Sequence, residues 1–302
     1  MQQGASAACS SQRAAPAGSS TVQQRGRSVE QRSLEAGTAA GDCFSPASAP
    51  GSKHVVDQGE EYHSTWAHRA WVWGATALLA ATFLRGCAKV HDPVSALAAA
   101  AAVVAAYYLA DFLTGMYHWS VDNYGSGATP IMGSQIAAFQ GHHQRPWTIT
   151  KREFCNNVHE VFKPATPFAA LCLAATSWTA APADVFLSTA TLLVCMCQQF
   201  HAWAHMKKSQ LPAAVDALQA AGVLLSRRIH GMHHRTPFEG NYCIVSGVWN
   251  EALDAGGSDA GFFRRLERFV AARTGVEPRC WYPPDYSWQE EENGVVHEAR
   301  AK

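Results

Sequence analysis

The sequence predicts an all-α fold, an integral membrane four-helix bundle with a histidine-rich di-metal site near one membrane surface. Two observations carry this prediction. Four apolar stretches lie between residues 70 and 200, and polar segments rich in histidine flank them. Many of these histidines recur at the i, i+4 spacing that places two side chains on one face of a helix. About 20 apolar residues cross a bilayer, and shorter or interrupted stretches are typical of a bundle with a polar site near its surface.

The chain divides into three regions by composition. Residues 1–65 are predicted to be a transit peptide followed by a disordered linker, because they are rich in Ala, Ser, Gly, Gln and Arg and contain no acidic residue before Glu30. A tail that is merely disordered is the alternative. Residues 66–255 form the predicted membrane-embedded, histidine-rich domain, and 256–302 a C-terminal amphipathic helix with a polar tail.

The composition excludes several classes of protein. The chain has 24 Lys and Arg against 24 Asp and Glu, so no nucleic-acid partner is expected. Its nine cysteines include no C-x-x-C pair, which argues against a zinc ribbon or a thioredoxin-type motif. His159-Glu160 is not followed by the second histidine that a zinc protease requires.

The four apolar stretches follow one another along the chain. The first spans residues 70–84 and the second 93–117, which carries Asp111 near its end. The third, 164–181, and the fourth, 185–200, are separated by a short A-P-A-D turn and form a predicted hairpin. Residues 211–225 contain Pro and Gly and are predicted to be an interfacial helix that does not cross. A soluble protein with buried helices is the alternative, because apolar runs of about 10–14 residues also occur in soluble cores.

This topology brings all the histidine clusters to one side. If the second stretch exits on that side, the hairpin returns the chain to the same side at His201. Basic residues are concentrated there, which is typical of the cytoplasmic or stromal side of a membrane. These basic residues are Lys151, Arg152, Lys163, Lys207, Lys208, Arg227 and Arg228.

The candidate ligands are eight histidines and one carboxylate. Asp122 lies four residues after His118, and His159 is a ninth candidate histidine, with Asn157 as the alternative ligand. Imidazole binds several transition metals, and eight or more ligands suffice for two ions, of which two irons that activate dioxygen make the best use. The eight histidines are His118, His142, His143, His201, His205, His230, His233 and His234.

These clusters also carry a family resemblance. The runs H-W-S-V-D from His118, Q-G-H-H from Gln140, H-A-W-A-H from His201 and H-G-M-H-H from His230 resemble the family of plasmanylethanolamine desaturases and plant fatty acid desaturase 4. The resemblance covers about 108–281. Within it, P-W-T-I-T at 146–150 is more similar to the plastid branch than to the animal branch.

The resemblance implies a function in detail. It implies a di-iron centre held by the eight histidines and His159 as a further candidate, with dioxygen as co-substrate. Asp122 matches a carboxylate that the family shares, and is predicted to serve catalysis either as an iron ligand or by orienting a ligand imidazole. The expected product is a trans double bond at carbon 3 of the sn-2 palmitoyl chain of phosphatidylglycerol. The expected electron donor is ferredoxin, with cytochrome b5 as the alternative. The expected location is a chloroplast membrane, thylakoid or envelope, crossed several times, with the endoplasmic reticulum as the alternative.

Three other functions remain as alternatives. A plasmanylethanolamine desaturase would form a vinyl ether, and a membrane lipid hydroxylase would use the same ligands. A haem-binding electron-transfer protein, which is not an enzyme, would place paired histidines deep within opposing helices. In this sequence the clusters lie at the ends of the apolar stretches and include adjacent doublets, which disfavours haem.

Overall fold

The computed structural model describes residues 62–284 of the chain. Nearly all of the predicted transit peptide and linker, and the polar tail after residue 284, lie outside the described residues. Within 62–284 every regular element is a helix, which confirms the all-α prediction for this part of the chain.

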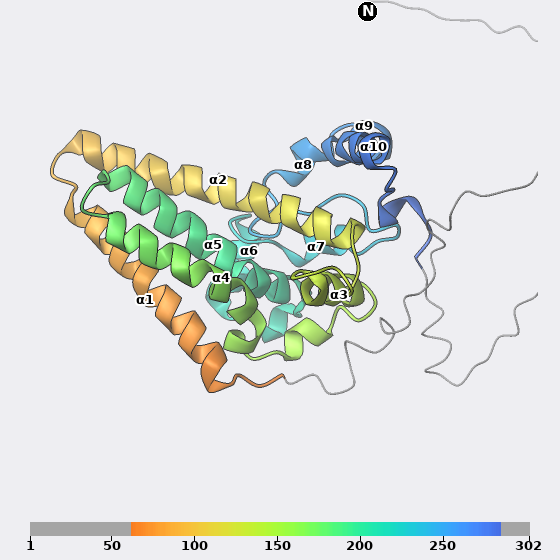
Figure 1. Cartoon of the computed structure of the whole chain (residues 1–302), viewed down its shortest axis with the longest axis horizontal. Helices are drawn as coiled ribbons and strands as arrows, with labels where there is room; N and C mark the ends of the chain where they lie inside the picture. Colours follow the sequence, from red (N-terminus) through yellow and green to blue (C-terminus); the bar gives the residue numbers. More distant parts are fainter. Residues whose placement is uncertain (1–61, 285–302) are drawn as a thin grey trace, which may run out of the picture. The chain divides into compact units, whose positions relative to one another are not determined.

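Four long helices make up the scaffold. They are α1 (Trp66–Ala88), α2 (Pro93–Asn123), α4 (Phe154–Ala175) and α5 (Ala181–His205). Helix α5 packs against each of the other three, and α1 also packs along α4. Figure 1 shows α4 and α5 lying between α1 and α2, with the α1–α2 and α4–α5 turns at the same end.

The long helices start where local chemistry allows. Thr65 and His68 form a capping box at the start of α1, and Asp92 caps α2 directly before Pro93. Helix α4 starts ten residues before the predicted apolar stretch and continues through Pro164 and Pro167. Its start is fixed by a tertiary contact that hydropathy does not reveal, because Ser64 Oγ accepts a hydrogen bond from the Asn156 N–H at 3.0 Å.

A buried ion pair joins the two turns at one end of the scaffold. The Lys89 ammonium lies 2.5 Å from Asp184 Oδ2, and the Asp184 side chain is almost fully buried. Lys89 also donates to the backbone carbonyl of Thr179 at 2.9 Å. Because these contacts compensate the buried charge, the turn between α1 and α2 is tied to the start of α5.

Two of the described helices, α2 and α5, are long and apolar enough to cross a membrane. Helices α1 and α4, with 23 and 22 residues, are long enough but are not among the candidate spans. Large apolar side chains nevertheless point outward from α1, α2 and α4. They include Trp73, Leu84, Leu97, Val104 and Leu171.

Shorter helices gather at the other end of the scaffold. They are α3 (Gly133–His142), η1 (Thr148–Lys151), η2 (Lys208–Gln210), α6 (Ala213–Ala220), α7 (Arg227–His233), α8 (Asn250–Leu253), α9 (Gly257–Ala260), α10 (Phe262–Thr274) and η3 (Arg279–Trp281). The interfacial helix predicted at 211–225 is represented by the eight residues of α6. Helix α10 ends at Gly275, which adopts the left-handed conformation with a φ of 72°.

The apolar side of α10 is narrower than its sequence indicates. Phe263 is buried among Trp119, Tyr242 and Leu253, whereas Phe269 of the same helix is 56% exposed. The position between them holds a buried acid, Glu267, which is 1% exposed. Helix α10 therefore packs on the scaffold through the Phe263 ring and through the Glu267 carboxylate, which accepts a hydrogen bond from the indole N–H of Trp119.

Candidate metal centre

The predicted ligands come from the ends of four helices. His118 and Asp122 lie in the last turns of α2, and His201 and His205 in the last turns of α5. His142 ends α3, and His143 follows it directly. Helix α7 carries His230 and His233, with His234 as its C-cap. The structure brings these eight histidines and Asp122 together at one end of the scaffold, opposite the Lys89 turn.

The donor atoms form two groups that a metal ion could occupy. The first, called group A, consists of five imidazoles: His142, His201, His205, His230 and His234. The second, called group B, consists of His118, Asp122, His143 and His233. In each group the donor atoms lie within 4.8 Å of one another. No thiolate belongs to either group.

Distances in group A fit neighbours on one ion. The His205 Nε2 atom is 2.9 Å from His142 Nε2 and 2.8 Å from His230 Nε2. The Nε2 atoms of His230 and His234 are 3.0 Å apart. Two nitrogens bound to one ion at about 2.1 Å are about 3.0 Å apart when they subtend a right angle. These three distances therefore fit nitrogens that bind one ion at near-right angles, and His201 supplies the fifth donor of group A.

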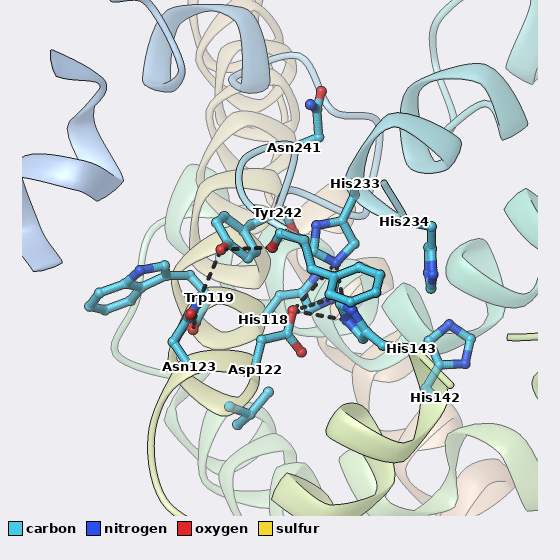
Figure 2. A network of polar contacts seen from close by, with 12 residues as sticks. His118, Trp119, Asp122, Asn123, His142, His143, His233, His234, Asn241 and Tyr242 are labelled. Atoms are coloured by element: carbon cyan, nitrogen blue, oxygen red, sulfur yellow. Dashed lines mark hydrogen bonds and ion pairs between the residues drawn. The ribbon is translucent and has the colours of Figure 1, made fainter. Parts of the chain in front are cut away.

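Group B is centred on the carboxylate of Asp122. Asp122 Oδ2 lies 3.2 Å from His118 Nε2, 3.2 Å from His143 Nε2 and 3.3 Å from His233 Nε2, as Figure 2 shows. At a tetrahedral angle, donors bound at about 2.1 Å are about 3.4 Å apart. The wider spacing of group B thus suits a site with three nitrogens and one oxygen.

Backbone carbonyls fix the protonation of two ligand imidazoles. His118 Nδ1 donates to the carbonyl of Tyr242 at 2.9 Å, and His233 Nδ1 donates to the carbonyl of Gly240 at 2.9 Å. A carbonyl only accepts, so the proton of each neutral ring sits on Nδ1. The lone pair on Nε2 then points into group B, as in protein metal sites where an outer hydrogen bond orients the ligand.

This arrangement fits a bound cation. The Nε2 lone pairs of His118 and His233 face the Oδ2 atom of Asp122, so acceptors confront one another. The Nε2 atoms of His118 and His201 and both carboxylate oxygens of Asp122 are buried without a hydrogen-bond partner. Buried acceptors without partners cost free energy unless a cation or proton lies between them. The donor set of imidazole and carboxylate suits iron, zinc and other divalent transition metals.

The sequence of the chain is similar to those of known lipid desaturases. The lipid desaturase domain matches residues 107–281 of the chain. The chain belongs to the lipid desaturase family. It is 43% identical to the chloroplastic fatty acid desaturase 4 of Arabidopsis thaliana, over 75% of the chain and 68% of that protein. It is 32% identical to plasmanylethanolamine desaturase 1 of Mus musculus, over 66% of the chain and 72% of that protein. It is also 42% identical to fatty acid desaturase 4-like 1, chloroplastic, of Arabidopsis thaliana, over 76% of the chain and 75% of that protein.

No solved structure matches the chain. Family membership makes the protein an oxidoreductase, and it confirms the resemblance drawn from the four histidine motifs. All four motifs lie inside the matched domain, as does η3, the last described helix of the desaturase.

Burial favours the neutral form of several ligand imidazoles of the desaturase. It lowers the pKa of His142 and His230 well below the usual value, and neighbouring imidazoles lower both further. Burial also lowers the pKa of His233 to about 4. Neutral imidazole is the form that binds metal, so near pH 7 these ligands need not lose a proton before an ion binds.

His159 lies outside both groups. Its Nδ1 donates to the carbonyl of Asn156 at 2.8 Å, and its Nε2 lies 2.9 Å from the carboxylate of Glu160. Its ring stacks on His68. The structure therefore does not bring this predicted ligand to the metal groups, because the local bonds of α4 hold the ring elsewhere.

Asn157, the alternative ligand to His159, also belongs to neither group A nor group B. Its amide donates to the carbonyl of Gln198 at 3.0 Å, and Gln198 Oε1 lies 3.3 Å from His201 Nδ1. A carbonyl-type oxygen beside Nδ1 orients the ring so that Nε2 points into group A. Asn157 thus supports the segment that orients a ligand.

Sequence reasoning noted Asp111 but gave it no role. Its side chain is fully buried, and Oδ1 accepts from the N–H groups of Val245, Ser246 and Gly247 at 3.1, 2.7 and 3.0 Å. These bonds hold the chain that follows Tyr242, whose carbonyl orients His118. An acid near the end of an apolar stretch indicates a buried polar contact. The sequence does not identify the partners of Asp111, because they lie more than 130 positions away in the chain.

Glu267 is a second buried acid that sequence reasoning missed. It accepts from the indole N–H of Trp119 at 3.2 Å and of Trp281 at 2.8 Å, and Arg264 pairs with it at 3.1 Å. Trp119 directly follows the ligand His118. Through Glu267, helix α10 and the segment after it hold the end of α2 that carries group B.

Proposed function

We propose that this desaturase acts in a chloroplast membrane and introduces a trans double bond at carbon 3 of the sn-2 palmitoyl chain of phosphatidylglycerol. One observation carries the proposal: two groups of imidazole and carboxylate donors, without thiolate, meet at one end of long apolar helices. The relation to a chloroplastic fatty acid desaturase at 43% identity supports the choice of substrate and compartment.

Two iron ions are the proposed occupants of groups A and B. Bound iron would supply the activation of dioxygen that is needed to remove hydrogen from an unactivated methylene. The overall reaction converts two adjacent methylenes, one dioxygen, two electrons and two protons into one alkene and two waters. Imidazole and carboxylate tolerate such an oxidising environment better than thiolates, which oxidise readily.

The residues of the chain hold and orient the ions. Eight imidazoles and the Asp122 carboxylate provide the donors, and the one acidic ligand belongs to group B. The carbonyls of Tyr242 and Gly240 fix the ring orientation of His118 and His233. His118, His230 and His233 have no exposed surface, which keeps bulk water from the inner side of both groups.

The proposed arrangement in the membrane follows from the scaffold. All four long helices cross the bilayer, and their outward apolar side chains, such as Leu97 and Leu171, contact lipid. The metal groups then lie near the membrane surface at which α2 and α5 end. A phospholipid head group would stay at this surface while its acyl chain extends along the apolar helices, which places carbon 3 close to the head group and to the metals.

Electrons must come from a separate protein. The sequence contains no dinucleotide-binding glycine motif and no C-x-x-C-H haem attachment motif. Ferredoxin is the proposed donor in the plastid, and cytochrome b5 takes that role if the protein resides in the endoplasmic reticulum.

A second function has support from one comparison. Plasmanylethanolamine desaturase 1 of the mouse shares 32% identity with the chain. The same donors would then act on an ether lipid of ethanolamine and form a vinyl ether. The lower identity makes this the second choice.

Lipid analysis separates the two functions. The chain is expressed in cells that make phosphatidylglycerol but lack its trans-3-hexadecenoic acid. We expect this acid to accumulate with the parent chain and with His159→Ala, and to be absent with His233→Ala/His234→Ala. A vinyl ether in ethanolamine lipids instead would assign the second function. Hydroxylated acyl chains without an alkene would contradict desaturation.

The compartment is tested separately. A fusion of residues 1–65 to a fluorescent protein should accumulate in plastids. Fluorescence in the cytosol or the endoplasmic reticulum would contradict the plastid assignment.

A further inference from the structure

One edge of the metal centre is less buried than the rest. Among the ligands, only the imidazoles of His143, His205 and His234 are not fully buried. His118, His201 and His230 on the inner side are at most 1% exposed. A macromolecule that exchanges electrons with ions bound here would therefore have its shortest approach along the edge where these three imidazoles lie.

Exposed cations border this edge. Lys207 follows His205 by two residues, Arg235 follows His234 directly, and Arg227 and Arg228 begin α7. All four side chains are exposed. We call these four residues the basic edge. Arg227 Nη1 donates to the backbone carbonyl of His205 at 3.3 Å, so the basic edge touches a ligand residue of group A.

The positive charge of the basic edge is not offset by acids in its own segment. Between residues 206 and 238 the only acidic residue is Asp216, and it pairs with Lys208 at 3.1 Å. The next acid along the chain, Glu239, pairs with Arg264. Within residues 62–284, no ion pair with an acid is found for Lys207, Arg227, Arg228 or Arg235.

The basic edge has the character of a protein-docking surface. Its exposed neighbours are small or polar: Ser209, Gln210 and Gly231. Segments that lie on a membrane surface combine basic residues with exposed Trp, Phe or Leu. In 206–238 the exposed large apolar residues are Leu218 and Val223, in and after α6, and none lies in η2 or α7. Complementary charge between such a surface and an acidic partner increases the rate of association and orients the two proteins as they meet.

We propose that the basic edge docks the acidic one-electron carrier protein that reduces this desaturase. The proposal rests on the proposed function, because only a redox-active centre needs such a partner. Each docking event would oxidise one reduced carrier by one electron, and iron held by groups A and B would accept that electron. Two events supply the two electrons that are consumed with one dioxygen and two protons when one alkene and two waters form.

The test measures binding without turnover. Arg228→Glu/Arg235→Glu reverses two charges of the basic edge and leaves Arg227, which contacts His205, in place. Arg265→Glu/Arg268→Glu makes the same change of charge at exposed positions of α10 and serves as the matched control. Each protein is placed in phosphatidylcholine nanodiscs and titrated at low and at physiological ionic strength. The probes are plant ferredoxin and cytochrome b5, two acidic carriers.

The expected result is specific to the position of the charges. The parent and the control should bind one of the carriers, and the reversal at the basic edge should weaken that affinity by on the order of tenfold or more at low ionic strength. Salt should weaken binding by the parent more than by this variant.

Three outcomes would overturn the proposal. In the first, the parent binds neither carrier, and in the second, both reversals bind like the parent. In the third, the basic-edge variant binds its carrier normally but loses a preference for nanodiscs that contain phosphatidylglycerol, which assigns the surface to lipid head groups. Because binding is measured without a lipid product, a wrong substrate assignment would leave these readouts unchanged.

Discussion

Replacing Asp122 by asparagine removes the only carboxylate from group B and leaves the donors of group A intact. The substitution keeps the size of the side chain but removes its negative charge, and it leaves one neutral amide oxygen, a weaker ligand than a carboxylate, in place of two carboxylate oxygens. Three ligand nitrogens lie within 3.3 Å of Asp122 Oδ2, so this oxygen has the position of a ligand. We therefore expect Asp122→Asn to lose the ion of group B and to keep the ion of group A.

The size of this effect has a lower bound. Removing a hydrogen-bond partner outside the coordination sphere weakens metal binding about 10- to 100-fold. That range corresponds to about 1.4–2.7 kcal/mol. Asp122 contacts the donors of group B themselves, so we expect the upper end of this range or more. None of the five donors of group A belongs to Asp122, and their affinity should change little.

The assay counts iron. The parent, Asp122→Asn and His159→Ala are loaded with ferrous iron without oxygen and dialysed against increasing chelator. The parent and His159→Ala should retain two ions per chain to a higher chelator concentration than the variant, which should fall to one. If Asp122→Asn keeps both ions with the affinity of the parent, the carboxylate is not a ligand. If it binds none, the division into two independent groups is wrong.

Three further predictions concern the scaffold around the site. Asp111→Ala leaves at least three buried N–H groups without an acceptor. Each unpaired N–H group costs about 1–3 kcal/mol, so the variant should have a much lower unfolding midpoint and a lower iron content than the parent. An unchanged midpoint and iron content would contradict the role of Asp111 in holding this loop. Gly115→Ala brings a methyl group within 2.4 Å of Cys243 Sγ, whereas Gly74→Ala meets nothing within 4 Å, so thermal unfolding should show a loss of about 1–3 kcal/mol for the first only. The metal-free chain should lose stability as the pH falls from 6.5 towards 4, because the pKa of His233 is lowered to about 4 and the unfolded chain takes up protons that the folded chain cannot; a flat unfolding midpoint over this range would refute it.

Spacing in the sequence predicted part of the site. Every pair of ligands at i, i+4 falls in one group: His118 with Asp122, His201 with His205, and His230 with His234. Adjacent ligands are divided, with His142 in group A and His143 in group B. Successive helical positions point about 100° apart, so this division follows from the same geometry that predicts the pairs.

Other features depend on contacts that no local pattern encodes. The start of α4 is set by Ser64, some 90 positions earlier in the chain, and Asp111 binds backbone groups in the loop after Tyr242. His159 is a histidine beside an apolar stretch, like the other predicted ligands, yet its ring bonds to Asn156 and Glu160 on its own helix. Burial and tertiary hydrogen bonds decide these positions, and a single sequence gives no measure of either.

The order of the ligands along the chain has a consequence for biosynthesis. The last ligand of group B is His233 and the last of group A is His234, so the two groups become complete within one residue of each other. All four long helices precede both residues. During translation, when the N-terminal part of a chain folds first, neither coordination sphere can close until the whole helical scaffold has been made. If the two groups hold iron as proposed, neither ion has its complete set of ligands on a nascent chain until the scaffold is finished.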